Sequence, residues 1–151
     1  MDQKNSERKN LAAMIQTKAA DSIPKDKIPA IICYRDKDFN MGIVGLGAAR
    51  ISDSYYRPAI IGAQGESETR ASARSIEEFS MIEALDELNE QYPGLLKKYG
   101  GHWKAAGLTV ENNKWDEFVA RISEIAERKL AGVPLVPTKK YDMELTPAYA
   151  N

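Results

Sequence analysis

Two strongly amphipathic helical segments constrain the fold of this chain more than any other feature. Apolar residues recur at helical spacing between Ile76 and Gln91, and again between Trp115 and Leu130. Each helix has one apolar side, which it must bury against another element of structure. The first stripe comprises Phe79, Ile82, Leu85 and Leu88, and the second comprises Trp115, Phe118, Val119, Ile122, Ile125 and Ala126.

Short apolar or alternating segments interleave with these helices and predict strands. The segment 28–34 is almost continuously apolar, which is typical of a strand covered on both faces. A second strand is expected at 58–61, followed by a polar turn at 62–68, and residues 69–76 alternate as a third. A further strand is expected at 105–110. The interleaving lacks strict β-α-β order, so the sequence predicts an α/β or α+β fold, a small mixed sheet with helices packed on it.

The remaining segments predict further helices and indicate how the chain divides into parts. Residues 6–20 have a thin apolar stripe and predict a connector helix. Residues 42–55 return to helical spacing, with Ile43, Leu46, Gly47 and Ile51 on one side. A short helical turn is expected from Pro93 to Tyr99, where the glycines at 100 and 101 would end it. We therefore divide the chain into a connector helix at 1–24, one domain at 25–131 and an extended tail at 132–151.

Composition narrows the classes of function. The net charge of −1 over 151 residues argues against a protein that coats nucleic acid through bulk charge, although a local basic pocket is compatible with it. No apolar run approaches the roughly 20 residues of a membrane span. Residues 1–5 do not resemble a secretory signal, so we expect a cytoplasmic protein without a membrane partner. A zinc site of usual composition cannot be built from His102 and Cys33 alone, and Cys33 is expected to be a buried strand residue.

The glycines between Gly42 and Gly47 invite comparison with a dinucleotide-binding loop. The wider gap between them comes first, however, and the required strand and acidic residue are not evident. We interpret these glycines as small residues that let a helix pack closely.

Strand periodicity places Ser72 and Arg74 on the same face of one predicted strand. An arginine can bind a phosphate through two parallel hydrogen bonds, and a hydroxyl can add a third. On this segment alone, an Arg74 paired with a surface carboxylate is the simpler interpretation.

The most informative stretch is GGHWKAAG, from Gly100 to Gly107. Two glycines allow backbone amides to turn toward a ligand, His102 can donate to a phosphate oxygen, and Lys104 adds charge nearby. A helix-capping glycine followed by a structural histidine is the alternative. That alternative explains only the glycines and the histidine, whereas the pattern extends over all eight residues and is therefore more specific.

Taken in order, these motifs resemble the DHH-associated C-terminal domain of RecJ-type single-strand exonucleases, in the DHH phosphoesterase superfamily. The resemblance rests on residues 72–76, the helix after them, 99–102 and 105–107, with similarity also at 42–50 and 56–58. Residues 39–41 and Ala49 depart from the family pattern. The resemblance implies that phosphates of nucleic acid are bound by Arg50, Ser72, Arg74, Gly100, Gly101 and His102.

The resemblance also implies partners and leaves alternatives open. It implies that the ligand is single-stranded DNA or a short oligonucleotide. It also implies a catalytic DHH lobe in cis that holds manganese or magnesium. No cofactor is expected in this chain. Because the chain has no Asp-His-His segment, we do not expect it to cleave DNA alone. The first function is the binding lobe of a metal-dependent 5′-to-3′ exonuclease of DNA repair and recombination. The others are the equivalent lobe of a cyclic-dinucleotide or short-oligonucleotide phosphodiesterase, and a stand-alone nucleic-acid-binding or partner-docking domain.

Overall fold

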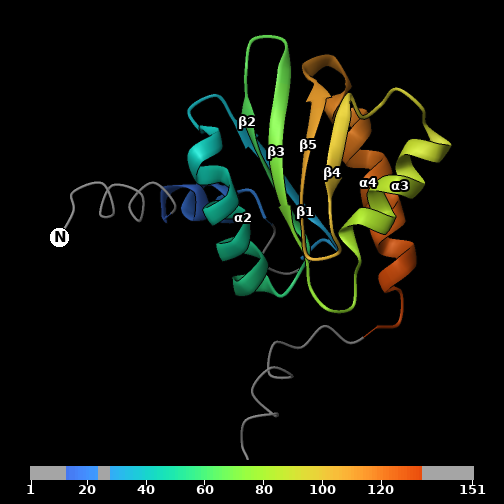
Figure 1. The fold of residues 1–151 in the computed structure, drawn as a ribbon. Helices are drawn as coiled ribbons and strands as arrows, with labels where there is room; N and C mark the ends of the chain where they lie inside the picture. The colour runs from blue at the N-terminus through green and yellow to red at the C-terminus, as the bar shows by residue number, and fades with distance from the viewer. Residues whose placement is uncertain (1–12, 24–27, 134–151) are drawn as a thin grey trace, which may run out of the picture.

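The computed structural model describes residues 13–23 and 28–133. Its centre is a five-stranded sheet with the order β1-β2-β3-β5-β4 (Figure 1). β1 is parallel to β2, and every other neighbouring pair is antiparallel. The predicted mixed sheet with packed helices is therefore confirmed. The strands are β1 (Ile32–Asp36), β2 (Ala59–Gln64), β3 (Glu68–Arg74), β4 (Lys98–Gly101) and β5 (Ala105–Glu111).

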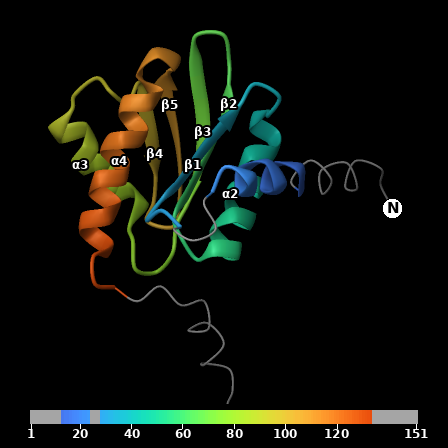
Figure 2. The ribbon, with the colours of Figure 1, turned by 180° about the vertical axis from the view of Figure 1, so that it is seen from behind.

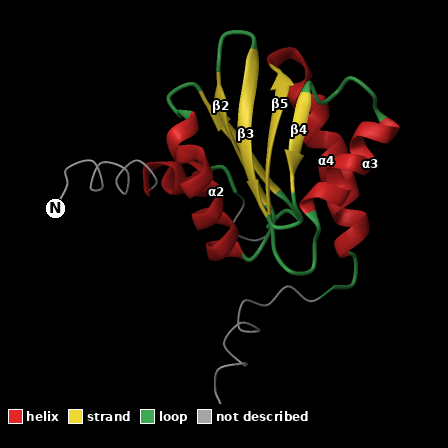
Figure 3. Ribbon diagram, in the orientation of Figure 1, coloured by secondary structure: helices red, strands yellow, loops and turns green. Residues whose placement is uncertain are grey.

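The helices cover different parts of the two faces of the sheet. On one face α2 (Met41–Tyr55) packs on β2 and β3, with a helix at 13–21 beside it (Figure 1). On the other face α3 (Met81–Gln91) and α4 (Trp115–Leu130) pack behind β4 and β5 (Figures 2 and 3). Within the described residues, the side of β5 and β4 that faces the same way as α2 has no helix over it (Figure 1).

Two apolar clusters hold these layers together, and β2 contributes to both. Ile61 is buried with Ile15 and Val44 in the cluster beneath α2. Its neighbour Ile60 is buried in the cluster beneath α3 and α4, together with Phe118. Alternate residues of a strand point to opposite faces, so a strand buried on both faces needs a continuous apolar run. Burying each such side chain contributes about 1.5–3 kcal/mol.

The helix predicted from Ile76 begins five residues later, at Met81. The Ser80 hydroxyl caps it by accepting a hydrogen bond from the Glu83 N–H at 3.4 Å. Before the cap, the Ser75 hydroxyl donates to the Phe79 carbonyl oxygen at 2.5 Å and holds the intervening residues in a turn. The apolar residues at 76 and 79 therefore belong to the core without being helical.

Four other local predictions are wrong. The first strand begins at Ile32 rather than at residue 28, and β2 runs to Gln64, so the turn predicted at 62–68 shrinks to 65–67. The segment ending in Gly100 and Gly101 is strand β4 rather than the end of a helical turn, because β5 supplies a hydrogen-bonding partner. Leu46, expected on the inner side of α2, is 45% exposed.

The predicted connector helix is described only from residue 13, and the predicted tail lies outside the described residues from residue 134. None of the helices in the described segments is long and apolar enough to cross a membrane.

Candidate nucleic-acid interface

One row of small residues crosses three strands on the α2 side of the sheet. Ser72 of β3 pairs with Gly107 of β5, which pairs in turn with Gly100 of β4. Directly opposed residues of antiparallel strands project to the same face. Ile61, the partner of Ser72 on β2, is buried beneath α2, so the row lies on the α2 side. The two segments that the sequence analysis selected therefore share one surface.

Rows on either side of this one add cationic residues. Arg74 lies two residues after Ser72 on β3 and pairs with Ala105 of β5. In the opposite direction, Arg70 pairs with Thr109, which pairs with Lys98. Strand alternation places all three rows on one side of the sheet. We call this surface the open face and define it as Arg70, Ser72, Arg74, Lys98, Gly100, Gly107 and Thr109.

Arg74 and Ser72 are half-buried and have no partner among the described residues. No ion pair or hydrogen bond of the Arg74 guanidinium or the Ser72 hydroxyl is found there, so the carboxylate partner considered for Arg74 is not present in that part of the chain. Two unpartnered groups of this kind on one strand are suited to binding an anion. The other described arginines, Arg50 excepted, are each held by a partner: Arg35, Arg57, Arg70, Arg121 and Arg128.

A glycine of α2 borders these two groups. A β-carbon added at Gly45 would lie 3.5 Å from Nη2 of Arg74 and 3.6 Å from Oγ of Ser72. Gly47 faces the helix at 13–21 instead, where a β-carbon would lie only 2.5 Å from Cγ2 of Ile15. Both glycines are inside α2, which supports our interpretation of this segment as closely packed helix rather than phosphate loop.

Gly100 and Gly101 have different structural roles. Gly101 has a φ of 143°, and a β-carbon there would lie 2.5 Å from the Ala106 Cα, so the hairpin itself requires glycine. A β-carbon at Gly100 would meet nothing within 4 Å, and one at Gly107 would come no closer than 3.8 Å to another atom. Glycine weakens a strand, and glycines with free space in front of them are typical of places where a ligand approaches the backbone.

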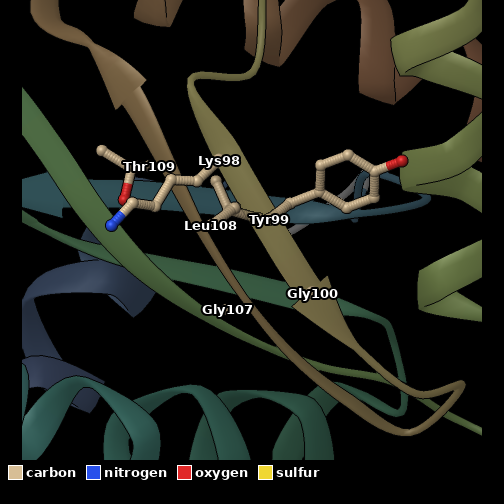
Figure 4. Close-up of a pocket in the computed structure, with 6 residues that line it drawn as sticks. All are labelled: Lys98, Tyr99, Gly100, Gly107, Leu108 and Thr109. Carbon is tan, nitrogen blue, oxygen red and sulfur yellow. The ribbon is translucent and has the colours of Figure 1, made fainter.

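A depression of about 210 Å³ lies beside the glycines of β4 and β5 (Figure 4). The side chains of Lys98 and Thr109 project to one side of the strands, and Tyr99 projects to the other, where its hydroxyl donates to Oδ1 of Asp86 at 2.7 Å (Figure 4). Thr109 is only 8% exposed, yet its hydroxyl has no hydrogen-bond partner in the segments that the structure covers. The lining residues are Lys98, Tyr99, Gly100, Gly107, Leu108 and Thr109.

The cations of the open face differ in how far nearby carboxylates neutralise them. Glu68 forms ion pairs with Lys97 at 2.6 Å and with Arg70 at 3.7 Å. The hydrogen bond from Lys97 holds the pKa of Glu68 below its ordinary value. Lys98 and Arg74, in contrast, form no ion pair within 13–23 and 28–133. Of the cations on the open face, these two are therefore the ones available to a ligand.

His102 and Arg50 lie differently with respect to this surface. The His102 N–H donates to the Ala105 carbonyl oxygen at 2.9 Å, which extends the β4–β5 ladder to the end where Arg74 lies. Its side chain is exposed. Arg50 is exposed on α2, about 140° around the helix axis from Gly45, because each residue turns the helix by about 100°. The structure thus places Arg50 on a different side of α2 from Gly45 and Arg74.

Sequence reasoning did not select Lys98, Gly107 or Thr109 as site residues. The period of two along β5 places Gly107 and Thr109 on one face and could have indicated them. Lys98 required the register between β4 and β5, which the sequence does not reveal.

Two other chemistries considered from the sequence have little support here. In the described part of the chain, no three His, Cys, Asp or Glu side chains gather into a metal-binding group. Cys33 lies in β1 against the core, and burial raises the pKa of its thiol to about 12. Such a thiol is protonated at neutral pH, as expected for a structural cysteine.

Comparison with known proteins agrees with these observations. The family described as DHHA1 domain matches residues 27–128. The single-stranded-DNA-specific exonuclease RecJ of Escherichia coli (strain K12) is 32% identical, over 98% of this chain and 27% of that protein. RecJ of Bacillus subtilis (strain 168) is 30% identical, over 95% of this chain and 18% of that protein. The chain therefore spans about a quarter or less of these relatives.

Solved structures show the same relationship in three dimensions. The crystal structure of RecJ from Thermus thermophilus in complex with Mg²⁺ matches with a TM-score of 0.69 and 30% identity, over 82% of this chain and 18% of that one. A structure of exonuclease RecJ bound to manganese also gives a TM-score of 0.69, with 28% identity over 88% of this chain and 33% of that one. The resemblance inferred from the motifs is thereby confirmed: this chain belongs to the DHHA1 family, as a RecJ-type domain of the DHH superfamily.

Proposed function

We propose that the open face binds the sugar–phosphate backbone of single-stranded DNA for a catalytic DHH lobe in the same polypeptide. One observation carries the proposal: Ser72, Gly107 and Gly100 form a row of small residues between two cations, Arg74 and Lys98, that have no partner in the described structure. Phosphates are bound by charged and hydroxyl donors, and a row of small residues lets a chain come close.

The spacing of the two cations favours an extended ligand. Arg74 and Lys98 lie in rows that are four residues apart, about 13 Å along the strands, and on strands that are separated by about 10 Å. Two cations at this separation fit two different phosphates of one strand better than a single phosphate. A strand with several phosphates can lie across the row of small residues and meet one cation at each end.

The names of the relatives support the rest of the proposal. RecJ of E. coli is named as a single-stranded-DNA-specific exonuclease, and solved RecJ structures contain Mg²⁺ or Mn²⁺. We propose a metal-dependent 5′-to-3′ exonuclease that acts in the cytoplasm in DNA repair and recombination, with its metal held by residues outside this chain. In this proposal the residues of the open face hold and orient the strand.

Binding of a fluorescent oligo(dT) of about 12 nucleotides tests the proposal, since single-strand sites span roughly 4–16 nucleotides. Arg74→Ala should weaken binding about tenfold or more, because charge-assisted hydrogen bonds contribute about 1.5–3 kcal/mol and 1.4 kcal/mol is about tenfold. The slope of log affinity against log salt should fall by about 1.

The matched control is Arg128→Ala, which removes an equal charge from α4 on the opposite face, where Arg128 pairs with Glu87. An Arg74→Ala protein that folds and keeps both the wild-type affinity and the wild-type salt slope would rule the site out. Competition by a cyclic dinucleotide, at a lower concentration than an oligonucleotide needs, would favour the phosphodiesterase alternative instead.

A further inference from the structure

Trp103 is a large aromatic side chain that this domain leaves in contact with solvent. It follows His102 in the hairpin between β4 and β5 and is 44% exposed. Among the described residues it contacts no other aromatic ring and no cation. The other tryptophan, Trp115, is 5% exposed and packs against Phe118 and the guanidinium of Arg35. Tryptophan is highly buried on average and is frequent where proteins contact ligands, so the exposed Trp103 is a candidate for a ligand contact.

The backbone that carries this ring is fixed by hydrogen bonds on both sides. The Trp103 carbonyl oxygen accepts from the Met81 N–H at 2.8 Å, at the start of α3. The carbonyl of the next residue accepts from the Ser75 N–H at 2.8 Å, and the N–H of the preceding residue donates to the Ala105 carbonyl oxygen at 2.9 Å. The hairpin tip is thus anchored to β3, β5 and α3, and the exposed ring has a rigid support.

The hairpin tip lies at the end of the open face where Arg74 is. Ala105 pairs with Arg74 and is two residues from Trp103. Two Cα–Cα steps and one cross-strand spacing put the Cα atoms of Trp103 and Arg74 at most about 13 Å apart. Because both side chains are long, a strand that is held by the guanidinium and extends past the hairpin tip can also contact the indole.

On the basis of the function proposed above, we propose that Trp103 stacks on a nucleobase of the strand whose phosphate Arg74 binds. Each nucleotide carries its base on the sugar next to the phosphate, so an aromatic ring beside a phosphate site is placed where it can contact a base. Every base has a π face, which makes such stacking tolerant of sequence. The open face would then bind backbone through Arg74, and the hairpin tip would bind one base of any type.

The decisive comparison uses two single strands of equal length and charge, an oligo(dT) and an abasic oligonucleotide, with this chain. The wild type should bind the oligo(dT) about tenfold more tightly. Trp103→Ala should lose that preference while its affinity for the abasic strand stays unchanged. Trp103→Phe should keep most of the preference, because it retains a ring.

Leu46→Ala is the control, because Leu46 is 45% exposed on α2 and should not affect either strand. Quenching of tryptophan fluorescence by oligo(dT) gives an independent readout, since Trp103 is the exposed one of the chain's two tryptophans.

Each outcome separates the stacking from the phosphate site. If the wild type binds both strands equally, or if Trp103→Ala and Trp103→Phe weaken both strands equally, stacking by Trp103 is overturned and the phosphate site stands. If Arg74→Ala leaves both affinities unchanged while the preference for bases persists and needs Trp103, the phosphate site is overturned and the base contact stands. If the wild type binds neither strand, both are overturned.

Discussion

Gly45 of α2 lies against the guanidinium of Arg74 on β3, where a β-carbon on the glycine would be 3.5 Å from Nη2. Two residues further along the same helix, Gly47 faces Ile15, and a β-carbon there would be 2.5 Å from Cγ2. The first distance is an ordinary van der Waals contact, and the second is a steric clash. One glycine therefore borders the site, and the other lets the helix at 13–21 dock.

Gly45→Ala should stabilise the domain. Alanine is favoured over glycine inside a helix by about 0.5–1 kcal/mol, and the new methyl group has room. Urea denaturation should show an increase of that size in the free energy of unfolding. A decrease would mean that the flank of α2 next to Arg74 is more tightly packed than the structure shows.

Gly47→Ala should destabilise the domain by about 1 kcal/mol or more, because overpacking exceeds the gain in helix propensity. The loss should be smaller in a background that already carries Ile15→Ala, since the two nearest atoms, Cγ2 and Cδ1, are gone. The same denaturation experiment measures the four proteins of this cycle. Equal effects of Gly47→Ala in both backgrounds would contradict docking of the helix at 13–21 on α2.

Lys98→Ala should weaken binding of long single strands more than binding of dinucleotides. Lys98 and Arg74 lie too far apart for one short ligand, so only a longer strand loses a contact. The salt slope for the long strand should fall by about 1. The control is Lys129→Ala, which removes the same charge from α4, where Lys129 pairs with Glu87. Equal losses for both ligand lengths would place Lys98 and Arg74 at the same phosphate.

Asp36 should stabilise the domain near neutral pH and lose this effect in acid. The N–H of Asp38 lowers the pKa of Asp36, and the ammonium of Lys18, 3.3 Å away on the helix at 13–21, lowers it further. A carboxyl group whose pKa is lower in the folded state stabilises the fold above its unfolded pKa of about 3.9, and this stabilisation disappears as pH falls through the folded pKa. Thermal midpoints of wild type and Asp36→Asn should therefore differ near neutral pH and converge as the pH falls below the ordinary pKa of an aspartate, about 3.9. A constant difference would contradict this linkage.

An element of this structure can be predicted from the sequence when its own residues determine its conformation. It is missed when pairing with a distant segment determines it. The helix from Trp115 to Leu130 is predicted to the residue because its apolar stripe is continuous and is buried except for the half-buried Val119. β4 was missed because its strand conformation comes from pairing with β5, and its glycines locally favour a turn. α3 begins late because Ser80 competes as a cap with the apolar residues before it.

The same distinction applies to the candidate site. Strand period alone predicts that Ser72 and Arg74 share one face of β3, and they do. Their assignment to a phosphate site came from the resemblance. Lys98 lies on the same face as Ser72 and Arg74 because of the register between β3, β5 and β4. No local sequence pattern predicts that register. Arg50 was assigned by resemblance, and the rotation of α2 turns it away from Gly45.

The most direct test of the account is an amide-resolved NMR titration of the isotopically labelled chain with oligo(dT). If the open face binds single-stranded DNA, the amides of Ser72, Arg74, Gly100 and Gly107 should shift together and saturate with one affinity. Amides of α3 and α4, which cover the opposite face of the sheet, should stay near their free positions. Shifts centred on α3 and α4, or an unchanged spectrum at saturating oligonucleotide, would contradict the proposed interface.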